Sequence, residues 1–201
     1  MVTVEVDACG VDRRLAAGEL SCPECAGVLV GWGYGRERTV RGPDEVVRLR
    51  PRRSRCVRCG VTHVLLPVVA LLRRADLASV IGAALVAKAA GAGHRRIAGV
   101  LRRPTETVRG WLRCFAARAE AVRSVFTRWV RSLSPDPVMP APVAGRWPGA
   151  DAVAAIIAAA RALADRFGML ELPLWDAAAG VSGGRLLAPG WPEVLINTSS
   201  P

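Results

Sequence analysis

Hydrophobic positions follow two different periodicities along this chain. Up to residue 66, short apolar runs of β-type residues are separated by Gly, Pro and paired Cys, which predicts short strands joined by turns. From residue 76 to residue 131, apolar residues recur every three or four positions, which predicts helices. The pattern therefore predicts a mainly α chain with a small β part at its start.

Three helices are expected in the helical region. The first ends at Gly91, a favourable terminating residue, and its mostly apolar face consists of Leu77, Ile81, Ala84, Leu85 and Lys88. The second covers about 94–102, with Ile97, Ala98 and Leu101 on its inner side. The third begins near Pro104 with Thr105 as N-cap, and its apolar stripe consists of Val108, Trp111, Leu112 and Phe115. Because the stripe continues, this third helix is expected to extend towards residue 131.

The remaining residues differ in composition from the helical region. Residues 132–150 are rich in Pro and Gly and are predicted to form a linker. An Ala-rich helix closed by Gly168 is expected over 151–166, followed by an irregular tail. The predicted organisation is a β domain over 1–70, a helical domain over 71–131, the linker, and a C-terminal helix with its tail over 151–201.

Four of the six cysteines form two Cys-x2-Cys pairs, Cys22 with Cys25 and Cys56 with Cys59. Zinc takes four thiolates in a tetrahedron, and each pair can supply two of them from one tight turn. Each pair is followed by an apolar run that can form a strand, so residues 1–70 are predicted to be a zinc ribbon on a small antiparallel sheet. Four thiolates leave no open coordination position, so the Zn²⁺ is expected to be structural.

Other roles for the cysteines and for His63 are less favoured. A thioredoxin-type redox pair would need a βαβ context, which this segment lacks. His63 lies four residues after Cys59, and it is expected on a strand facing solvent or the helical part rather than on the metal. Cys9 lies outside the pairs, and Cys114 is expected to be a small buried residue on a helix.

Positive charge is concentrated in the middle of the chain. The formal net charge is +11, with +16 carried by residues 36–131 and small negative charges on either side. Such a balance favours a polyanionic partner, either nucleic acid or an anionic membrane. The start lacks the features of a signal peptide, and no apolar stretch reaches the roughly 20 residues of a membrane span. A cytoplasmic, nucleoid-associated protein without membrane attachment is therefore expected.

The two helices within 94–115 have the spacing of a helix-turn-helix. This unit needs a small residue where its helices touch and apolar residues about ten and thirteen positions later, and Ala98, Val108 and Trp111 meet these needs. The segment resembles the helix-turn-helix of resolvases and insertion-sequence transposases through Arg95, Ile97, Ala98, Leu101, Thr107, Val108, Trp111 and Leu112. One departure is Arg102, which stands at the turn position usually held by Gly.

This resemblance implies that the third helix is a recognition helix in the major groove of double-stranded DNA. Arg109 and Arg113 would bind guanine edges, and Glu106 would accept a hydrogen bond from cytosine. Its other outward residues would be Thr105, Thr107 and Gly110, and the phosphate contacts would come from Arg95, Arg96, Arg102 and Arg103. The alternative is an Arg-rich helical bundle that binds no specific ligand.

Over residues 20–115, the cysteine pairs and the helices together are similar to the N-terminal DNA-binding region of insertion-sequence transposases. They are also similar to short bacterial proteins of unknown function that combine a zinc ribbon with a helix-turn-helix. The resemblance implies DNA binding without catalysis. A transposase of the Asp-Asp-Glu type needs three carboxylates that hold two metals on a large sheet, and about 70 residues after 131 are too few for such a domain.

The leading hypothesis is a non-enzymatic, zinc-stabilised protein that binds specific DNA sequences and assists a separate transposase or integrase of a mobile element. A stand-alone transcriptional regulator would use the same residues, as would the DNA-binding subunit of a divided transposase. A third class is an RNA-binding or interaction module that uses the zinc ribbon. A homodimer would suit paired DNA half-sites, although the sequence does not require one.

Overall fold

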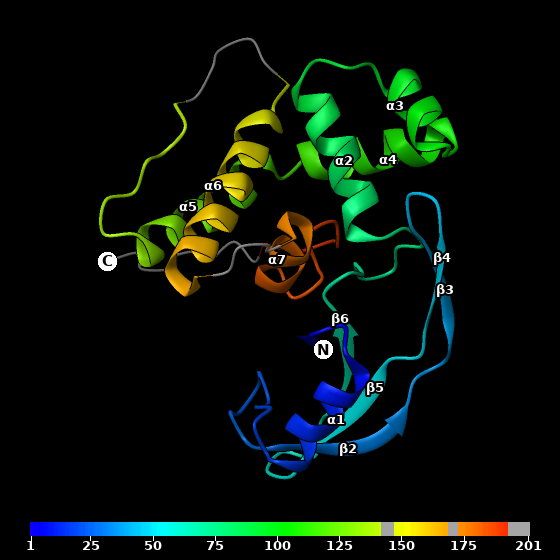
Figure 1. Ribbon diagram of the computed structural model, residues 1–201, viewed down its shortest axis with the longest axis vertical. Helices are drawn as coiled ribbons and strands as arrows, with labels where there is room; N and C mark the ends of the chain where they lie inside the picture. Colours follow the sequence, from blue (N-terminus) through cyan, green and yellow to red (C-terminus); the bar gives the residue numbers. More distant parts are fainter. Residues whose placement is uncertain (142–146, 169–172, 193–201) are drawn as a thin grey trace, which may run out of the picture. The chain divides into compact units, whose positions relative to one another are not determined.

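Strands and most helices belong to different parts of the chain in the computed structural model, which describes residues 1–141, 147–168 and 173–192 (Figure 1). Contacts divide the chain into two units, the first formed by residues 1–79 and 175–184, and the second by 80–174 and 185–201. Parts of the predicted linker and of the predicted tail, residues 142–146, 169–172 and 193–201, lie outside the described residues.

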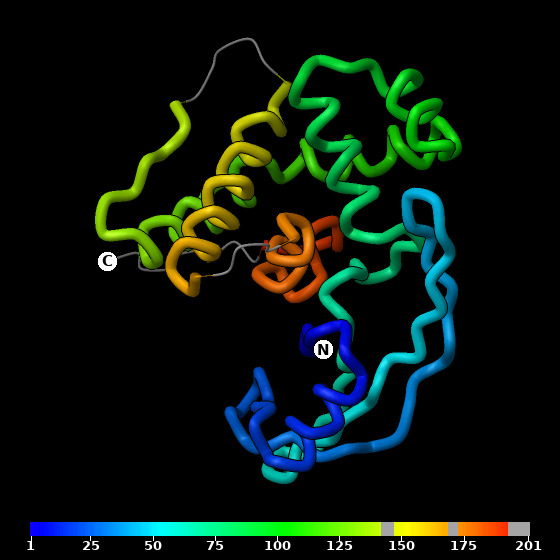
Figure 2. Tube along the Cα trace, in the orientation of Figure 1, coloured from blue at the N-terminus to red at the C-terminus, as the bar shows by residue number. Residues whose placement is uncertain are grey.

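A four-stranded sheet organises the first unit, with the strand order β1-β6-β5-β2. The strands are β1 (Val2–Val4), β6 (Thr62–Pro67), β5 (Arg52–Cys56) and β2 (Leu29–Tyr34). β1 runs parallel to β6, whereas the β6–β5 and β5–β2 pairs are antiparallel. The chain continues from β2 into β3 (Arg38–Arg41), turns, and returns through β4 (Val46–Leu49) into β5 (Figure 2). The mainly α fold with a small sheet is thus confirmed in its coarse form.

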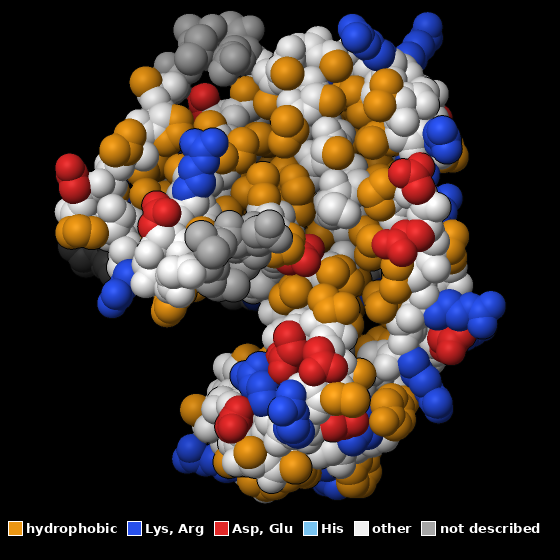
Figure 3. All heavy atoms as spheres, viewed as in Figure 1, with side chains coloured by type: hydrophobic (Ala, Val, Ile, Leu, Met, Phe, Trp, Pro, Cys, Tyr) orange, Lys and Arg blue, Asp and Glu red, His pale blue; other side chains and the backbone are white. Residues whose placement is uncertain are grey.

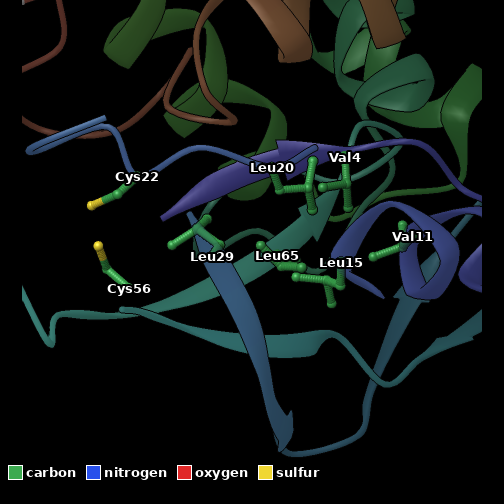
Figure 4. Close-up of a cluster of buried hydrophobic side chains, with 8 residues drawn as sticks. All are labelled: Val4, Val11, Leu15, Leu20, Cys22, Leu29, Cys56 and Leu65. Atoms are coloured by element: carbon green, nitrogen blue, oxygen red, sulfur yellow. The ribbon is translucent and has the colours of Figure 1, made fainter. Parts of the chain in front are cut away.

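Helix α1 (Ala8–Ala16) covers one side of this sheet and was not expected from the sequence. It begins after Asp7, whose carboxylate accepts hydrogen bonds from the backbone N–H groups of Cys9 and Gly10. Its buried side chains join strand residues in a small core (Figure 4), which consists of Val4, Val11, Leu15, Leu20, Cys22, Leu29, Cys56 and Leu65. Two of the paired cysteines are therefore core residues of this unit.

Residues 175–184 complete the first unit, although the sequence predicted an irregular tail there. They include most of helix α7 (Leu174–Val181). The backbone N–H of Leu72 donates to the carbonyl of Gly184 at 2.7 Å, and the Thr3 hydroxyl donates to the carbonyl of Gly180 at 3.4 Å. These contacts join segments more than 100 residues apart, which local sequence patterns do not reveal.

Five helices make up most of the second unit: α2 (Ala78–Ala89), α3 (His94–Leu101), α4 (Thr105–Ala116), α5 (Ala119–Leu133) and α6 (Ala150–Phe167). α6 packs against α5 and ends, as expected, at Gly168, which has a φ of 62°. Among the described residues, no helix has the length and apolar character needed to cross a membrane.

The expected extended third helix is two helices, and its expected N-cap is also different. α4 ends at Ala116 and α5 begins at Ala119, with Arg118 between them. The guanidinium of Arg118 donates to the carbonyl oxygens of Ala188 and Trp191, so a contact from outside the helices accompanies the break. At the other end, Pro104 is the N-cap residue of α4 and Thr105 is the first helical residue.

The turn between α3 and α4 places Arg102 in a backbone conformation that Gly adopts more readily than other residues. Arg102 ends α3 in the left-handed conformation, with φ 52° and ψ 48°. Residues that have a Cβ atom adopt this conformation less readily than Gly does. Among them, Asn adopts it more readily than β-branched residues do. The turn therefore has the backbone of a helix-terminating Gly while it carries a basic side chain.

Two substitutions at Arg102 separate this backbone preference from the loss of the guanidinium. We expect Arg102→Val to lower the free energy of unfolding by about 1 kcal/mol relative to Arg102→Asn, because only Asn accepts the left-handed turn readily. Denaturant unfolding followed by circular dichroism measures this difference. Equal stability of the two variants would show that the turn relaxes to another conformation.

Candidate metal centre and nucleic-acid interface

The two cysteine pairs have the same backbone geometry. The N–H of Ala26 donates to the carbonyl of Cys22 at 2.8 Å, and the N–H of Gly60 donates to that of Cys56 at 3.0 Å. Both donors have a positive φ, 56° at Ala26 and 75° at Gly60. Each turn places the two thiols of its pair on the same side, so each turn presents two ligands together.

The four Sγ atoms of Cys22, Cys25, Cys56 and Cys59 all lie within 4.8 Å of one another. A tetrahedral ion with Zn–S bonds of 2.3 Å would separate its sulfur ligands by about 3.8 Å. The distance is 3.8 Å between Cys22 and Cys59, and 3.5 Å between Cys25 and Cys56. The predicted ligands are thus brought together at a spacing that could hold a metal ion.

The cluster has one buried side and one exposed side. Cys22 and Cys56 are buried in the small core, whereas Cys59 is exposed and Cys25 is half-buried. Figure 4 shows the sulfur atoms of Cys22 and Cys56 pointing towards each other at the end of the apolar cluster. A bound ion would therefore connect the core to the outer turns.

The thiols of Cys56 and Cys59 differ in pKa, because each has different neighbouring groups. The backbone N–H of Cys59, together with that of Arg58 and the neighbouring thiols, lowers the pKa of Cys56 to about 6. At Cys59 the backbone N–H of Val61 also lowers the pKa. Burial and the other three sulfur atoms oppose this effect and raise the pKa of Cys59 to about 12. Negative charge on one sulfur thus opposes charge on the next, and a cation between them would relieve this repulsion.

His63 lies beside this cluster, which corrects the expectation that it faces solvent or the helical part. The residue is 3% exposed, with Nε2 of its ring 3.3 Å from Cys22 Sγ and Nδ1 3.0 Å from the Met1 amine. Burial, followed by the nearby amine charge, lowers the pKa of His63 and favours a neutral ring. A neutral ring can donate one hydrogen bond to the sulfur, as residues around metal ligands commonly do.

Gly27 is a second feature of the cluster that the cysteine motif does not reveal. A Cβ at this position would lie 2.7 Å from Cβ of Arg58 and 2.9 Å from Sγ of Cys56. Its carbonyl also accepts a hydrogen bond from the N–H of Cys22 at 2.8 Å. The close approach of the two turns therefore depends on the absence of a side chain here.

The inner residues predicted for α3 and α4 are largely buried. Ile97 and Ala98 on α3 are 2% and 3% exposed, and on α4 the most buried residues are Val108, Trp111, Leu112 and Phe115, at 0 to 6%. The ring of Phe115 also stacks on Trp147, with 5.8 Å between the centroids. These contacts fix which side of each helix faces outward.

The predicted DNA-contacting residues lie on the outer side of this helix pair. Arg95, Arg96, Arg102, Glu106, Arg109 and Arg113 are exposed, whereas Arg103, Thr105, Thr107 and Gly110 are half-buried. Figure 3 shows basic side chains projecting from the surface over α3 and α4. Their contact with DNA stays a prediction, because the structure contains the chain alone.

Several of these residues already have partners within the chain. Arg103 donates from Nη1 to the carbonyl oxygens of Leu101 and Arg102, so it helps to end α3. Arg109 Nη1 lies 3.5 Å from the carboxylate of Glu106 one turn earlier, and both side chains are well exposed. Such an exposed pair contributes little to stability, so Arg109 can exchange it for another acceptor at low cost.

Sequence reasoning missed two basic residues beside α4. Lys88, at the end of α2, and His94, at the start of α3, line a shallow hollow together with Arg109 and Arg113. Trp147 forms another part of its lining. A signal existed in the sequence, since both residues flank the Gly-containing turn between two predicted helices, but their approach to α4 is a tertiary contact.

Removal of single thiols tests the metal centre. We expect Cys22→Ser or Cys56→Ser to lose most of the bound metal and to destabilise the first unit, because each is both a ligand and a core residue. Metal content per chain can be measured by mass spectrometry after gel filtration. Cys9→Ser and Cys114→Ser are matched controls that should retain the metal, and equal metal content in all four variants would contradict the assignment.

Substitution of Gly27 tests the same centre without removing a ligand. We expect Gly27→Ala to weaken metal binding at least tenfold, because the new methyl group would separate the two turns. Gly99→Ala is a suitable control, since a Cβ there meets no atom within 4 Å. Competition with a chromophoric chelator measures the affinity, and an unchanged value for Gly27→Ala would show that the turns can approach each other differently.

Comparisons with known proteins bring no further information about either candidate site. Models of protein families, curated protein sequences and solved structures were each compared with the chain, and none of them matches it. The interpretation of the cysteine cluster and of the helix pair therefore rests on the residues and contacts described above.

Proposed function

We propose that this chain is a non-enzymatic protein that binds double-stranded DNA sequence-specifically through α3 and α4, with a structural Zn²⁺ in its first unit. The observation that carries the proposal is the two-sided character of α4. Val108 and Phe115 are fully buried on one side, whereas Arg109 and Arg113 are exposed on the other. A helix held by its apolar side, with basic residues outward, suits insertion into a major groove.

The short connection between α3 and α4 supports a helix-turn-helix. Three residues, 102–104, separate the helices, and the first of them has the left-handed conformation. Ala98 is 3% exposed, in keeping with a small residue at the contact of two helices. We infer that α4 is the recognition helix and that α3 positions it on the DNA backbone.

Specific roles follow from the position of each outward side chain. Arg109 and Arg113 are one helical turn apart on α4, so both can reach base edges in one groove, and Arg forms two hydrogen bonds with guanine. Arg95 and Arg96 begin α3 and, among the described residues, form no ion pair, which leaves them available for phosphates. Lys88 and His94 extend the same basic surface beside α4.

Zn²⁺ is the ion that we propose for the cysteine cluster. Four thiolates at tetrahedral spacing favour zinc over cations that prefer oxygen ligands. With four protein ligands the ion would have no position for substrate or water, so its contribution is the stability of the first unit. The residues that would hold it are Cys22, Cys25, Cys56 and Cys59.

The biological setting that we propose is a mobile element, where the protein would assist a separate transposase or integrase. The similarity of the cysteine pairs and of the 94–115 segment to transposase DNA-binding regions favours this setting over a transcriptional regulator. Selection of genomic fragments on the zinc-loaded protein would distinguish the two. Sites in terminal inverted repeats would support the mobile element, whereas promoter sites would identify a nucleoid-bound regulator.

Base recognition by α4 can be tested on a fragment from that selection. We expect Arg109→Ala to weaken binding to the selected site by about 1–3 kcal/mol and binding to random duplex by much less, because a lost guanine contact affects one sequence. Arg128→Ala is a charge-matched control on the exposed side of α5. Fluorescence anisotropy at fixed salt measures each affinity. An equal loss on both duplexes would make Arg109 a phosphate contact instead.

A further inference from the structure

The side of the main sheet opposite to α1 is open to solvent over β2, β5 and the start of β6, whereas residues 175–184 cover its β1 end, where Leu66 is buried and Thr3 donates to Gly180. Alternation along β2 places Leu29 on the core side and Val30 and Trp32 on the other, with Val30 39% and Trp32 50% exposed. In the paired strands, Arg55 faces Val30, and Thr62 on β6 faces Arg55. The open face consists of Val30, Trp32, Arg53, Arg55, Thr62 and Val64.

This face combines an exposed indole ring with guanidinium groups. The guanidinium of Arg55 lies over Trp32, 5.0 Å from the ring centroid, which is a cation–π contact. Strands β2, β5 and β6 contain no Asp or Glu, whereas residues 48–58 contain six arginines.

Tyr34 belongs to the other side of the sheet, although it is two residues from Trp32. A register shift between Gly31 and Tyr34 pairs Tyr34 with Arg52. Arg52 lies over the Tyr34 ring at 4.4 Å, and its Nε donates to Asp12 of α1 at 2.5 Å. Trp32 is therefore the aromatic ring that the open face presents.

The chemistry of this face suits an unpaired nucleic-acid strand. A base can stack on the exposed part of the Trp32 ring, and stacking of this kind tolerates every base. Arg53 and Arg55 lie close enough along β5 to bind the phosphates on either side of that base. A duplex keeps its bases paired and stacked, so it cannot use the indole ring in this way.

We propose that the open face of β2, β5 and β6 is a second nucleic-acid site, which binds single strands by base stacking on Trp32 and phosphate contacts from Arg53 and Arg55. The proposal is independent of duplex recognition by α4, because it uses residues of the first unit alone. The predicted zinc ribbon would then bind a ligand of its own, in addition to stabilising the first unit.

The test compares two labelled strands of equal charge on the full-length, metal-loaded chain. One is a 15-nucleotide oligothymidine, and the other is an abasic strand with the same number of phosphates. We expect tighter binding of oligothymidine. Trp32→Ala should weaken that binding about tenfold and change abasic binding less than twofold, because stacking alone is lost. An oligouridine of the same length would show whether the site prefers RNA.

Matched variants keep the result interpretable. Trp129→Ala removes another exposed indole, 39% exposed on α5, and should leave both affinities unchanged. If Trp32→Ala has lost its metal or its fold, Trp32→Phe takes its place in the test. Because Phe keeps an aromatic ring, this variant should bind oligothymidine within about threefold of the wild-type chain. Arg109→Ala should not alter single-strand binding, so failure of duplex recognition and failure of this proposal are distinguishable.

Three results would overturn the proposal. The first is equal affinity of the wild-type chain for the oligothymidine and abasic strands, which would reduce the site to phosphate attraction. The second is an equal loss in Trp32→Ala and Trp129→Ala. The third is displacement of oligothymidine by polyglutamate as effectively as by unlabelled oligothymidine, which would identify an acidic protein as the better partner for this face.

Discussion

Convergence of four sulfur atoms is the constraint on which the first unit depends. Cys22 and Cys56 lie in a core of eight residues, and their turns bring together segments more than 30 positions apart. The unit buries other side chains such as Leu66, Leu71 and Trp175, but it is small, and small domains commonly use a metal or disulfides as further support. The proposed metal ion would join these segments directly, so its binding and the folding of this unit would be coupled.

The same constraint sets the register of the sheet and hence the residues on each face. Cys56 ends β5 and pairs with Leu29 at the start of β2, so both point into the core. A shift by one residue would move Cys56 away from the cluster and would turn Trp32 inward. The cysteine turns therefore determine that Trp32 and Arg55 lie outward together. The second unit has no such dependence, since its helices are held by apolar contacts around Val108, Phe115 and Phe126.

Sequence patterns predicted those features that depend on neighbouring residues. The cysteine pairs, the helix limits near Gly91 and Gly168, and the buried side of α4 all follow from local spacing. The missed features depend on distant contacts. His63 is buried because the strand after Cys59 returns beneath Cys22, and α7 joins the first unit across more than 100 residues. The break at Arg118 has no Gly or Pro to indicate it, and its side chain binds carbonyl groups of residues 188 and 191.

The proposed metal would also explain how the sheet can leave part of one face uncovered. A sheet without other support must bury both faces, or keep its second face polar, to remain stable and soluble. Here α1 covers one face and the cysteine cluster holds the strand ends, while residues 175–184 cover only the β1 end of the other face, so the part that carries Trp32 is not needed for the core. Residues such as Trp32, which would otherwise be buried or replaced by polar residues, can then remain half-exposed. An exposed indole beside Arg55 is costly for solubility unless a ligand covers it, and this cost is the physical reason to seek that ligand.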